Sequence, residues 1–350
     1  MTRFIDVPNL SRLVNAVGVV PFMDGLAAAI AEDFRRWNDF EKCPRTANHS
    51  DVGVIELMPV ADDERFAFKY VNGHPRNPAM GLSTVMAFGA YAEVSTGYPL
   101  LLSELTLTTA FRTAAMSLVA ARALARPDSR SMGMIGSGAQ AEFQALTFHH
   151  LLGIEELRIY DIDAAAMQKL ERHLAAAAPA LEVVAVDAPE TCARGADIVT
   201  TVTADKTWAT ILTGDMVEPG MHVNALGGDC PGKTELAADV LHAGKIFVEF
   251  EPQTRVEGDI QQLAADHPVT PIWEVLAGVS QGRNDAEQIT VFDSVGFALE
   301  DFSALRFIYE KSREYNIGET IALVPELEDP KDLFELVLDN HGQAFGRKAA

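Results

Sequence analysis

Residues 132–141 have the sequence M-G-M-I-G-S-G-A-Q-A, which places the pattern G-x-G-x-x-A directly after a strand-like run and at the start of a helical one. Gly136 permits the tight turn, and Gly138 lets a pyrophosphate approach the backbone. The small Ala141 allows the helix to pack closely on the strand. Phosphates would lie at the helix N-terminus, where free N–H groups and the helix dipole favour an anion. The stretch therefore predicts a dinucleotide-binding turn.

The elements on the C-terminal side of this turn follow one rhythm. A strand–helix alternation at a spacing of about 30 residues predicts a parallel sheet with crossover helices. We therefore expect an α/β fold that contains a Rossmann-type doubly wound parallel sheet. The strand-like runs lie at residues 132–136, 157–161, 181–186, 196–203, 222–228 and 245–250, and helical runs lie at 139–152 and 164–178.

Asp161 ends the strand that follows the glycine turn, 25 residues after Gly136 (161 − 136 = 25). A carboxylate near this place accepts both ribose hydroxyls of NAD and would repel the 2′-phosphate of NADP. No Arg follows immediately, so NAD is the predicted cofactor. The alternative is a plain glycine turn in which Asp161 caps a helix.

The N-terminal side of the turn has a different pattern. Residues 20–38 carry apolar side chains four apart and predict an amphipathic helix. The strand-like runs that follow are separated by turn clusters and predict an antiparallel sheet, and an Ala-rich helix is expected at 108–125. Residues 317–336 leave the strand–helix rhythm, so we expect them to return to this region. The strand-like runs lie at 52–58, 66–71, 84–94 and 99–105.

These patterns divide the chain into two expected domains. The length of 350 residues fits that number, since domains average roughly 150 residues. An α+β domain is expected from residues 1–118 together with 317–350. The Rossmann domain is expected from residues 119–316.

The charge balance excludes one class of partner. The chain has 28 Lys and Arg residues against 50 Asp and Glu residues, a formal net charge of −22. No Lys- or Arg-rich stripe interrupts this acidity, so neither nucleic acid nor an anionic membrane is an expected partner. The first 13 residues lack a signal-peptide pattern, and the chain has no apolar stretch long enough for a membrane span.

Cysteine and histidine usage favours neither a disulfide framework nor a metal site. The three cysteines are widely spaced and form no C-x-x-C pair, which fits a reducing, cytoplasmic setting. The histidines near the motifs have a spacing that fits no metal site. The residues are Cys43, Cys192 and Cys230, and His49, His74 and His222.

Several charges in the N-terminal region stand where apolar residues are expected. Alternation places Glu56 and Lys69 on apolar strand faces, Arg112 lies in an Ala-rich helix start, and Arg45 precedes the sheet. One interpretation is a cross-strand Glu56–Lys69 ion pair on a solvated face, with Arg112 reaching solvent from its helix. The other is that the three cations converge on a substrate carboxylate while Glu56 receives a cationic group. The spacing leaves both interpretations open.

A second cluster follows the strand-like run at 222–226. Residues 227–236 read G-G-D-C-P-G-K-T-E-L, and glycines before an acid at the end of a parallel strand let backbone and carboxylate approach a ligand. Asp229 is the best candidate for a general acid/base, and we expect it in a partly desolvated pocket. The alternative is an Asx turn or a cap for the segment after Pro231.

Together, these motifs resemble the ornithine cyclodeaminase/mu-crystallin family over nearly the whole chain. The many blocks in the same order are far more specific than the glycine turn alone. They are Arg45, E-L-M-P-V-A at 56–61, F-K-Y-V-N-G-H-P at 68–75, S-E-L-T at 103–106, R-T-A-A at 112–115, G-S-G-A-Q at 136–140, T-T-V-T-A-D-K at 200–206, G-G-D-C-P-G-K-T-E-L at 227–236 and V-F-D-S-V-G-F-A-L-E-D at 291–301.

The resemblance implies roles for the matching residues. Arg45, Lys69 and Arg112 would hold the amino-acid carboxylate, with Val295 near the substrate. Glu56 and Asp229 would face the side-chain amine, and Asp229 would be the catalytic acid/base. The resemblance also implies that the first domain binds substrate and pairs sheets in a homodimer. Residues lining NAD would be Thr84, Arg112, Gly136, Gly138, Ala139, Gln140, Asp161, Thr203, Leu226, Gly227, Gly228, Lys233 and Ser294.

The activity implied by the resemblance is that of an NAD-dependent lyase acting on L-ornithine. Hydride removal, ring closure by the δ-amine and hydride return would yield L-proline and ammonia without net redox change. The acid at Asp229 favours cyclodeamination within the family. Lysine as substrate, a ketimine reductase or amino-acid dehydrogenase, and a non-catalytic NAD-binding protein remain alternatives, because a single methylene is discriminated by only about 1–3 kcal/mol.

Overall fold

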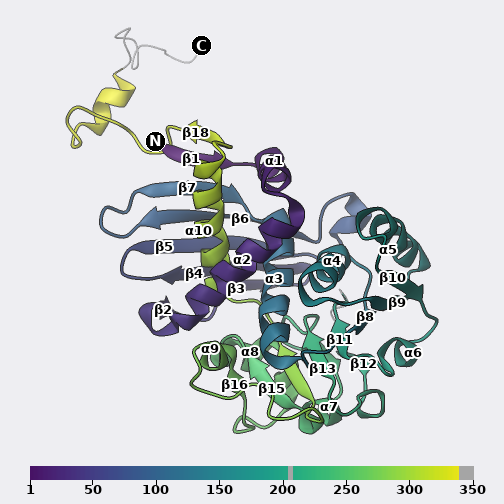
Figure 1. Cartoon of the computed structure of the whole chain (residues 1–350). Helices are drawn as coiled ribbons and strands as arrows, with labels where there is room; N and C mark the ends of the chain where they lie inside the picture. Colours follow the sequence, from purple (N-terminus) through teal and green to yellow (C-terminus); the bar gives the residue numbers. More distant parts are fainter. Residues whose placement is uncertain (204–207, 339–350) are drawn as a thin grey trace.

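The computed structural model describes residues 1–203 and 208–338, and Figure 1 shows two large sheets flanked by helices. The first sheet has the strand order β18-β1-β7-β6-β5-β4-β2, with β3 paired to β4. Its strands are β1 (Thr2–Ile5), β2 (Glu41–Lys42), β3 (Thr46–Ser50), β4 (Gly53–Ala61), β5 (Arg65–Gly73), β6 (Val85–Glu93), β7 (Pro99–Glu104) and β18 (Glu319–Ile321).

Alternating side chains give this sheet one buried face. Along β4, Val54, Met58 and Val60 are buried while Ile55 and Leu57 are exposed, the period of two that a strand with one packed face requires. Strands β4 to β7 form the predicted antiparallel meander. The sheet continues beyond the predicted strands at one edge, where β1 runs parallel to β7 and antiparallel to β18. The two helices after β1 carry the chain away, so β1 need not form a hairpin with its neighbour.

Helices α3 (Thr106–Leu124) and α10 (Ala298–Glu314) pack against the buried face, α1 (Val7–Val17) contacts β1, and α2 (Val19–Arg35) packs on α3 and α10. Figure 1 shows α2 and α10 lying across the sheet. The predicted amphipathic helix is α2, and its apolar stripe of Phe22, Leu26, Ile30 and Phe34 is buried.

The predicted domain boundaries stay predictions, but the helix contacts depart from them at one place. Helix α10 lies inside the range 119–316 expected for the Rossmann domain, yet it packs against β4, β5, β6 and β7 of the first sheet. Its apolar side chains, including Phe302, belong to the same core as Tyr91 and Phe40 of the N-terminal region. Residues 339–350 of the predicted first domain lie outside the described residues.

The second sheet confirms the predicted doubly wound parallel architecture. All its pairings are parallel, and the order is β10-β9-β8-β11-β13-β17-β15-β16. The chain runs outward from β8 in one direction and then from β11 in the other, so the topological switch point lies between these two strands. The strands are β8 (Ser131–Ile135), β9 (Glu156–Tyr160), β10 (Glu182–Ala185), β11 (Ile198–Thr201), β13 (His222–Ala225), β15 (Lys245–Val248), β16 (Thr270–Pro271) and β17 (Thr290–Asp293).

Helices connect these strands. A further, two-stranded parallel sheet pairs β12 (Trp208–Leu212) with β14 (Thr234–Leu236), and the sequence patterns did not predict it. The helices are α4 (Ala141–Leu152), α5 (Ala164–Ala177), α6 (Pro189–Ala193), α7 (Ala238–Ala243), α8 (Glu251–Glu257) and α9 (Ile272–Leu276). Short 3-10 helices are η1 (Trp37–Asp39), η2 (Asn77–Met80), η3 (Gly214–Met216), η4 (Asp259–Gln262) and η5 (Leu333–Val337).

Among the described residues, no single helix is both long and apolar enough to cross a membrane. Helices α1 and α2 are long and apolar enough only when their lengths are taken together, and the chain bends by 99° between them.

Candidate active site

The glycine turn lies at the carboxyl end of β8, beside the switch point. Gly136 has φ +112° and donates its N–H to the Tyr160 carbonyl at 2.8 Å. A Cβ at Gly136 would lie 2.6 Å from the Val202 carbonyl oxygen, so glycine is required by both conformation and space. A Cβ at Gly138 would meet no protein atom within 4 Å. The turn is therefore tightly packed against the protein at Gly136 and open at Gly138.

Asp161, at the end of β9, holds this turn in place. Its carboxylate accepts the Ser137 N–H at 2.6 Å and the Asp163 N–H at 2.9 Å. The helix that follows is capped by Asp163, which accepts the Ala165 N–H. The alternative in which Asp161 caps that helix is therefore wrong. Asp161 instead joins the two strand ends at which a ribose would lie.

The start of α4 has polar atoms without partners. Ser137 Oγ and Gln140 Oε1 are buried, and neither has a hydrogen bond within the part of the chain that the structure describes. Buried polar atoms without partners are costly, so a polar ligand at this place would satisfy them. With the open side of Gly138 and the exposed Ala139, they form a cradle whose chemistry fits a dinucleotide.

Lys233 and Glu235 both contact Thr203, which follows strand β11. The Lys233 ammonium donates to the Thr203 carbonyl at 3.1 Å and to Asp229 Oδ1 at 3.2 Å. Glu235 accepts the Thr203 N–H at 3.0 Å and also the Thr203 hydroxyl. Burial raises the pKa of Glu235 to about 7, against the opposing effects of Lys233 and Thr203. The predicted cofactor residues Thr203 and Lys233 thus lie together, whereas residues 204–206 of the family block lie outside the described residues.

Gly227 and Gly228 lie too close to two carboxylates for any side chain to fit, which the sequence patterns did not indicate. A Cβ at Gly227 would lie 1.9 Å from the Glu235 carboxylate, and a Cβ at Gly228 would lie 2.7 Å from Asp259 Oδ2. The glycines make room for two buried acids rather than only for a ligand. Asp259 in turn accepts the backbone N–H groups of Glu235 and Leu236, at 2.7 and 2.8 Å. These carboxylates define the path of the loop.

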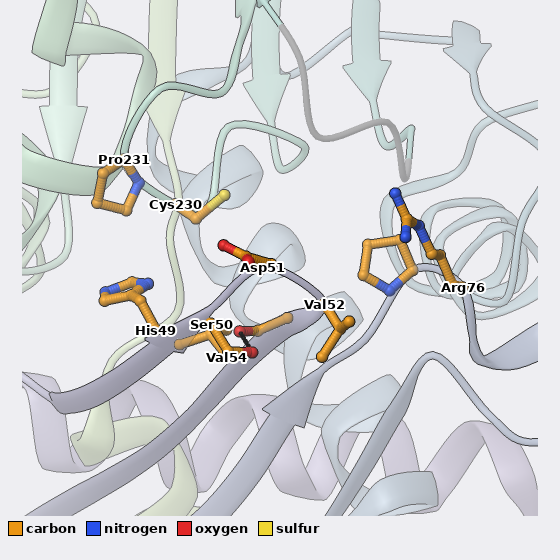
Figure 2. A pocket seen from close by; sticks show the side chains of 10 residues that line it. His49, Ser50, Asp51, Val52, Val54, Arg76, Cys230 and Pro231 are labelled. Atoms are coloured by element: carbon orange, nitrogen blue, oxygen red, sulfur yellow. Dashed lines mark hydrogen bonds between the residues drawn. The ribbon is translucent and has the colours of Figure 1, made fainter.

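Asp229 is more exposed than expected. Its side chain is 52% exposed and pairs with the almost fully buried Lys233. The expectation of a partly desolvated pocket is therefore wrong for this structure, because the loop places the carboxylate at its surface. The next two residues, Cys230 and Pro231, line a cavity of about 440 Å³ together with the β3–β4 turn (Figure 2). Asp51 and Arg76 line the same cavity, which marks a route from solvent to the loop.

Arg45 lies in the segment between β2 and β3 and contacts residues from several parts of the site. Its guanidinium donates to Glu56 at 3.1 Å and to the carbonyls of Val295 and Gly296 at 2.7 and 2.5 Å. Arg45 Nε also lies 3.2 Å from Glu257. Because Val295 belongs to the segment between β17 and α10, Arg45 joins the first sheet to the second.

Lys69 and Arg112 meet two acids of α10. The Lys69 ammonium lies 2.9 and 2.8 Å from the two Asp301 oxygens, and Arg112 Nη1 donates to Glu300 at 2.5 Å. Arg112 Nε lies 3.4 Å from Asp301, so one carboxylate serves both cations. The cross-strand Glu56–Lys69 pair is therefore wrong. Residue Val71 faces Glu56 across the strands.

The three cations influence one another electrostatically. Burial lowers the pKa of Lys69 to about 8, the positive charges of Arg112 and Arg45 lower it further, and Asp301 opposes the shift. Arg112 is buried rather than reaching solvent, so the interpretation in which it snorkels is also wrong. The structure brings Arg45, Lys69 and Arg112 together, as the ligand-binding interpretation requires.

Glu249 supports the segment that carries Ser294 and Val295. It accepts the Ser294 hydroxyl, and it accepts the N–H groups of Val295 and Gly296 at 3.1 and 3.3 Å. Burial and repulsion by Glu300 raise the pKa of Glu249 to about 8. The predicted site residues Ser294 and Val295 are thus positioned by an acid that the sequence analysis missed.

Two predicted cofactor residues are held through their own backbone groups. The Thr84 carbonyl, ahead of β6, accepts the His74 N–H at 2.9 Å, and Leu226 donates its N–H to the Thr201 carbonyl at 2.9 Å. Three of the four acids that the sequence patterns did not identify carried a usable signal, since they interrupt apolar runs. They are Glu249 in F-V-E-F, and Glu300 and Asp301 in A-L-E-D-F, whereas Glu257 lies in the polar stretch Q-T-R-V-E-G-D.

Comparison with known proteins gives one family. The model of the ornithine cyclodeaminase/mu-crystallin family matches residues 8–316. A curated ornithine cyclodeaminase of Brucella suis biovar 1 (strain 1330) is 53% identical over 335 residues, which covers 96% of this chain and 93% of the relative.

Two solved structures are similar over most of both chains. A lysine cyclodeaminase, described in terms of recognition of L-lysine, L-ornithine and L-2,4-diaminobutyric acid, has a TM-score of 0.86 and 29% identity, with 95% of this chain and 98% of that chain covered. An archaeal alanine dehydrogenase dimer with bound NAD has a TM-score of 0.84 and 31% identity, with 92% and 99% covered.

Proposed function

Because the chain belongs to the ornithine cyclodeaminase/mu-crystallin family, we propose that it is an NAD-dependent enzyme that converts L-ornithine to L-proline and ammonia. The resemblance noted in the sequence is confirmed by the family match. The observation that carries the proposal is 53% identity to an ornithine cyclodeaminase over 96% of the chain. The cluster of cations and acids between the two sheets is the chemistry that a diamino acid requires.

NAD is the cofactor, and its nicotinamide would take a hydride from the substrate Cα and return it to the cyclic imine. We propose that the glycine turn, Ser137, Gln140 and Asp161 hold the dinucleotide. Two buried polar atoms without partners and the open side of Gly138 support this assignment.

The substrate carboxylate would bind between Lys69 and Arg112. The ammonium of Lys69 can donate three hydrogen bonds and directs one side at Asp301. Arg112 donates Nη1 to Glu300, and its Nε, 3.4 Å from Asp301, has no hydrogen bond among the described residues. Free donors on two adjacent buried cations suit a carboxylate. Arg45 would act next to them, through Val295 and Glu56.

Asp229 would take the proton from the terminal amine, which makes that nitrogen a nucleophile for ring closure. Glu56 would hold the same end of the substrate. Fixing the carboxylate and the amine of a flexible chain at two places brings the reacting atoms together, which lowers the entropic cost of cyclisation.

The direct test supplies L-ornithine and a catalytic amount of NAD⁺, and follows proline, ammonia and the absorbance of NADH. The expected result is equal amounts of proline and ammonia without accumulation of NADH. Stoichiometric NADH would instead indicate an amino-acid dehydrogenase, the activity named for the archaeal neighbour. The absence of both products at every pH tested would contradict the proposal and would favour a non-catalytic NAD-binding protein.

Lysine is the second candidate substrate, because a structural neighbour recognises L-lysine as well as L-ornithine. The two differ by a methylene, and apolar packing discriminates a methylene by about 1–3 kcal/mol. A comparison of kcat/KM for the two amino acids decides between them. A higher value for lysine would replace ornithine in the proposal.

The assembly proposed here is a homodimer. The outer face of the first sheet carries exposed apolar side chains, and one structural neighbour is described as a dimer. The cytoplasmic location stays a prediction from the sequence.

A further inference from the structure

Glu257 is a buried acid beside the site that none of the assigned roles uses. It is the last residue of α8, and its side chain is 8% exposed. Its Oε2 atom lies 3.2 Å from Arg45 Nε, but the two groups are not aligned for a hydrogen bond. Within residues 1–203 and 208–338, neither Glu257 Oε2 nor Arg45 Nε has a hydrogen-bond partner. A buried carboxylate oxygen without a donor is costly, so the site is incomplete as it stands.

The charges around Glu257 also lack one positive partner. The Arg45 guanidinium interacts with Glu56, Glu257 and Asp229, and the Glu56 and Asp229 charges oppose ionisation of Glu257. Lys233 pairs with Asp229. Three carboxylates therefore share two cations, and Arg45 also directs donors at two backbone carbonyls.

Burial raises the pKa of Glu257 to about 7. The Arg45 charge opposes this shift, and the charges of Glu56 and Asp229 add to it. An ammonium group entering between the three acids would supply the missing positive charge and the missing donor at once.

We propose that Glu257, together with Glu56 and Asp229, binds the terminal ammonium of the diamino-acid substrate and so selects against amino acids with an apolar side chain. This inference rests on the proposed function and adds a specificity residue to it. An apolar side chain of the same length would leave the Glu257 oxygen without a donor, which is the circumstance in which a polar pocket rejects an isostere.

The test compares L-ornithine with L-norvaline, which has the same α-amino acid end and the same three side-chain carbons but no terminal amine. Binding of each to wild-type protein and to Glu257→Gln is measured by calorimetry in the presence of NADH, which cannot accept a hydride, so that ornithine binds without being converted. We expect the variant to bind ornithine about 10- to 100-fold more weakly and norvaline within about twofold of wild type, because only ornithine loses a charged partner. The affinity for NAD⁺ is expected to be unchanged.

Two further variants serve as controls. Glu251→Gln removes a carboxylate from the same helix, where Glu251 pairs with Arg255 near the surface, and it is expected to bind both ligands like wild type. Glu257→Asp keeps the charge on a shorter side chain, and ornithine affinity is expected to fall between wild type and Glu257→Gln. This second variant keeps the test valid if Glu257→Gln folds poorly.

The outcomes separate the inference from the proposed function. Equal losses for ornithine and norvaline would overturn the inference, because they would show that Glu257 acts only by orienting Arg45 at the carboxylate end. Unchanged discrimination in the variants would also overturn it, while ornithine turnover by wild type would leave the proposed function standing. A wild-type protein that binds ornithine no better than norvaline would overturn both.

Discussion

Asp229, the proposed acid/base, lies on a loop rather than on a strand. Gly227 and Gly228 pass over the carboxylates of Glu235 and Asp259, and the chain then presents Asp229 beside the buried Lys233. The carboxylate reaches both solvent and the site, so it can exchange protons with water between steps. Its exposure in the structure therefore suits proton exchange.

Replacing Asp229 by Asn tests this role. The amide keeps the size and the contact with Lys233 but cannot accept a proton, so kcat is expected to fall by about 10²–10⁴-fold. NAD⁺ affinity, measured by fluorescence titration, is expected to stay within about twofold, since Asp229 is not required to hold the dinucleotide turn. A variant with wild-type kcat would show that another group moves the proton.

Helix α10 supplies the acids that pair with the cations proposed to bind the substrate carboxylate. Glu300 and Asp301 in its first turn neutralise Arg112 and Lys69, and its N-terminal residue follows the segment held by Glu249. The helix also packs its apolar side chains on the first sheet. One element therefore connects the second sheet to the first and supplies counter-ions to Lys69 and Arg112, the cations proposed to bind the substrate.

Removing one of these counter-ions is expected to destabilise the fold. Asp301→Asn leaves the Lys69 ammonium, which is 1% exposed, with only a neutral partner. Breaking a buried pair costs about 3–5 kcal/mol, measured as the free energy of unfolding in urea. The matched control is Asp24→Asn, whose pair with Arg122 is at the surface and is worth about 1 kcal/mol or less. Equal losses for the two variants would contradict a structural role for Asp301.

Three buried acids give the whole molecule a stability that depends on pH. The pKa values of Glu235 and Glu257 are raised to about 7, and that of Glu249 to about 8. A carboxyl group with a raised pKa binds more protons folded than unfolded. Its stabilising contribution is complete below the unfolded pKa and is lost as the pH rises through the folded pKa.

We therefore expect the free energy of unfolding of the protein without ligands to fall between pH 6.5 and 8. Below this window His222, whose pKa burial lowers to about 3, has the opposite effect, because it must be neutral in the fold. Urea unfolding at half-unit pH intervals measures the slope. Glu249→Gln is expected to flatten it, and an unchanged slope in that variant would contradict the assignment.

At the scale of the whole molecule, the outer face of the first sheet is expected to form the dimer. Its exposed apolar side chains lie on neighbouring strands, and Phe88 stacks on Tyr70 at 5.0 Å. Light scattering is expected to give about twice the chain mass of 37.9 kDa. Phe88→Asp is expected to yield monomers because it places a charge in an apolar interface, whereas Val279→Asp on an exposed loop is not. A dimer unaffected by Phe88→Asp would assign the interface to another face.

Local patterns were enough to predict most elements. The spacing of apolar residues predicted α2, and the strand–helix alternation around the glycine turn predicted the doubly wound sheet. These patterns depend on neighbours a few residues apart, which share a helix face or a strand face. The strands β1 and β18 were not predicted, because each is short and acquires its ladder from residues more than 90 positions away.

The sequence by itself determined which residue types the site would contain. Charges within apolar runs identified Glu56, Lys69 and Arg112, Arg45 was noted just before the sheet, and the glycines before Asp229 identified a loop. Only the tertiary structure decided how these charges pair. Lys69 meets Asp301 across 232 positions of the chain, and Arg45 meets Val295 across 250, because α10 and the segment before it fold back on the first sheet. Periodicity carries no information about such distant partners, since an ion pair forms wherever the packed elements bring opposite charges within a few ångströms.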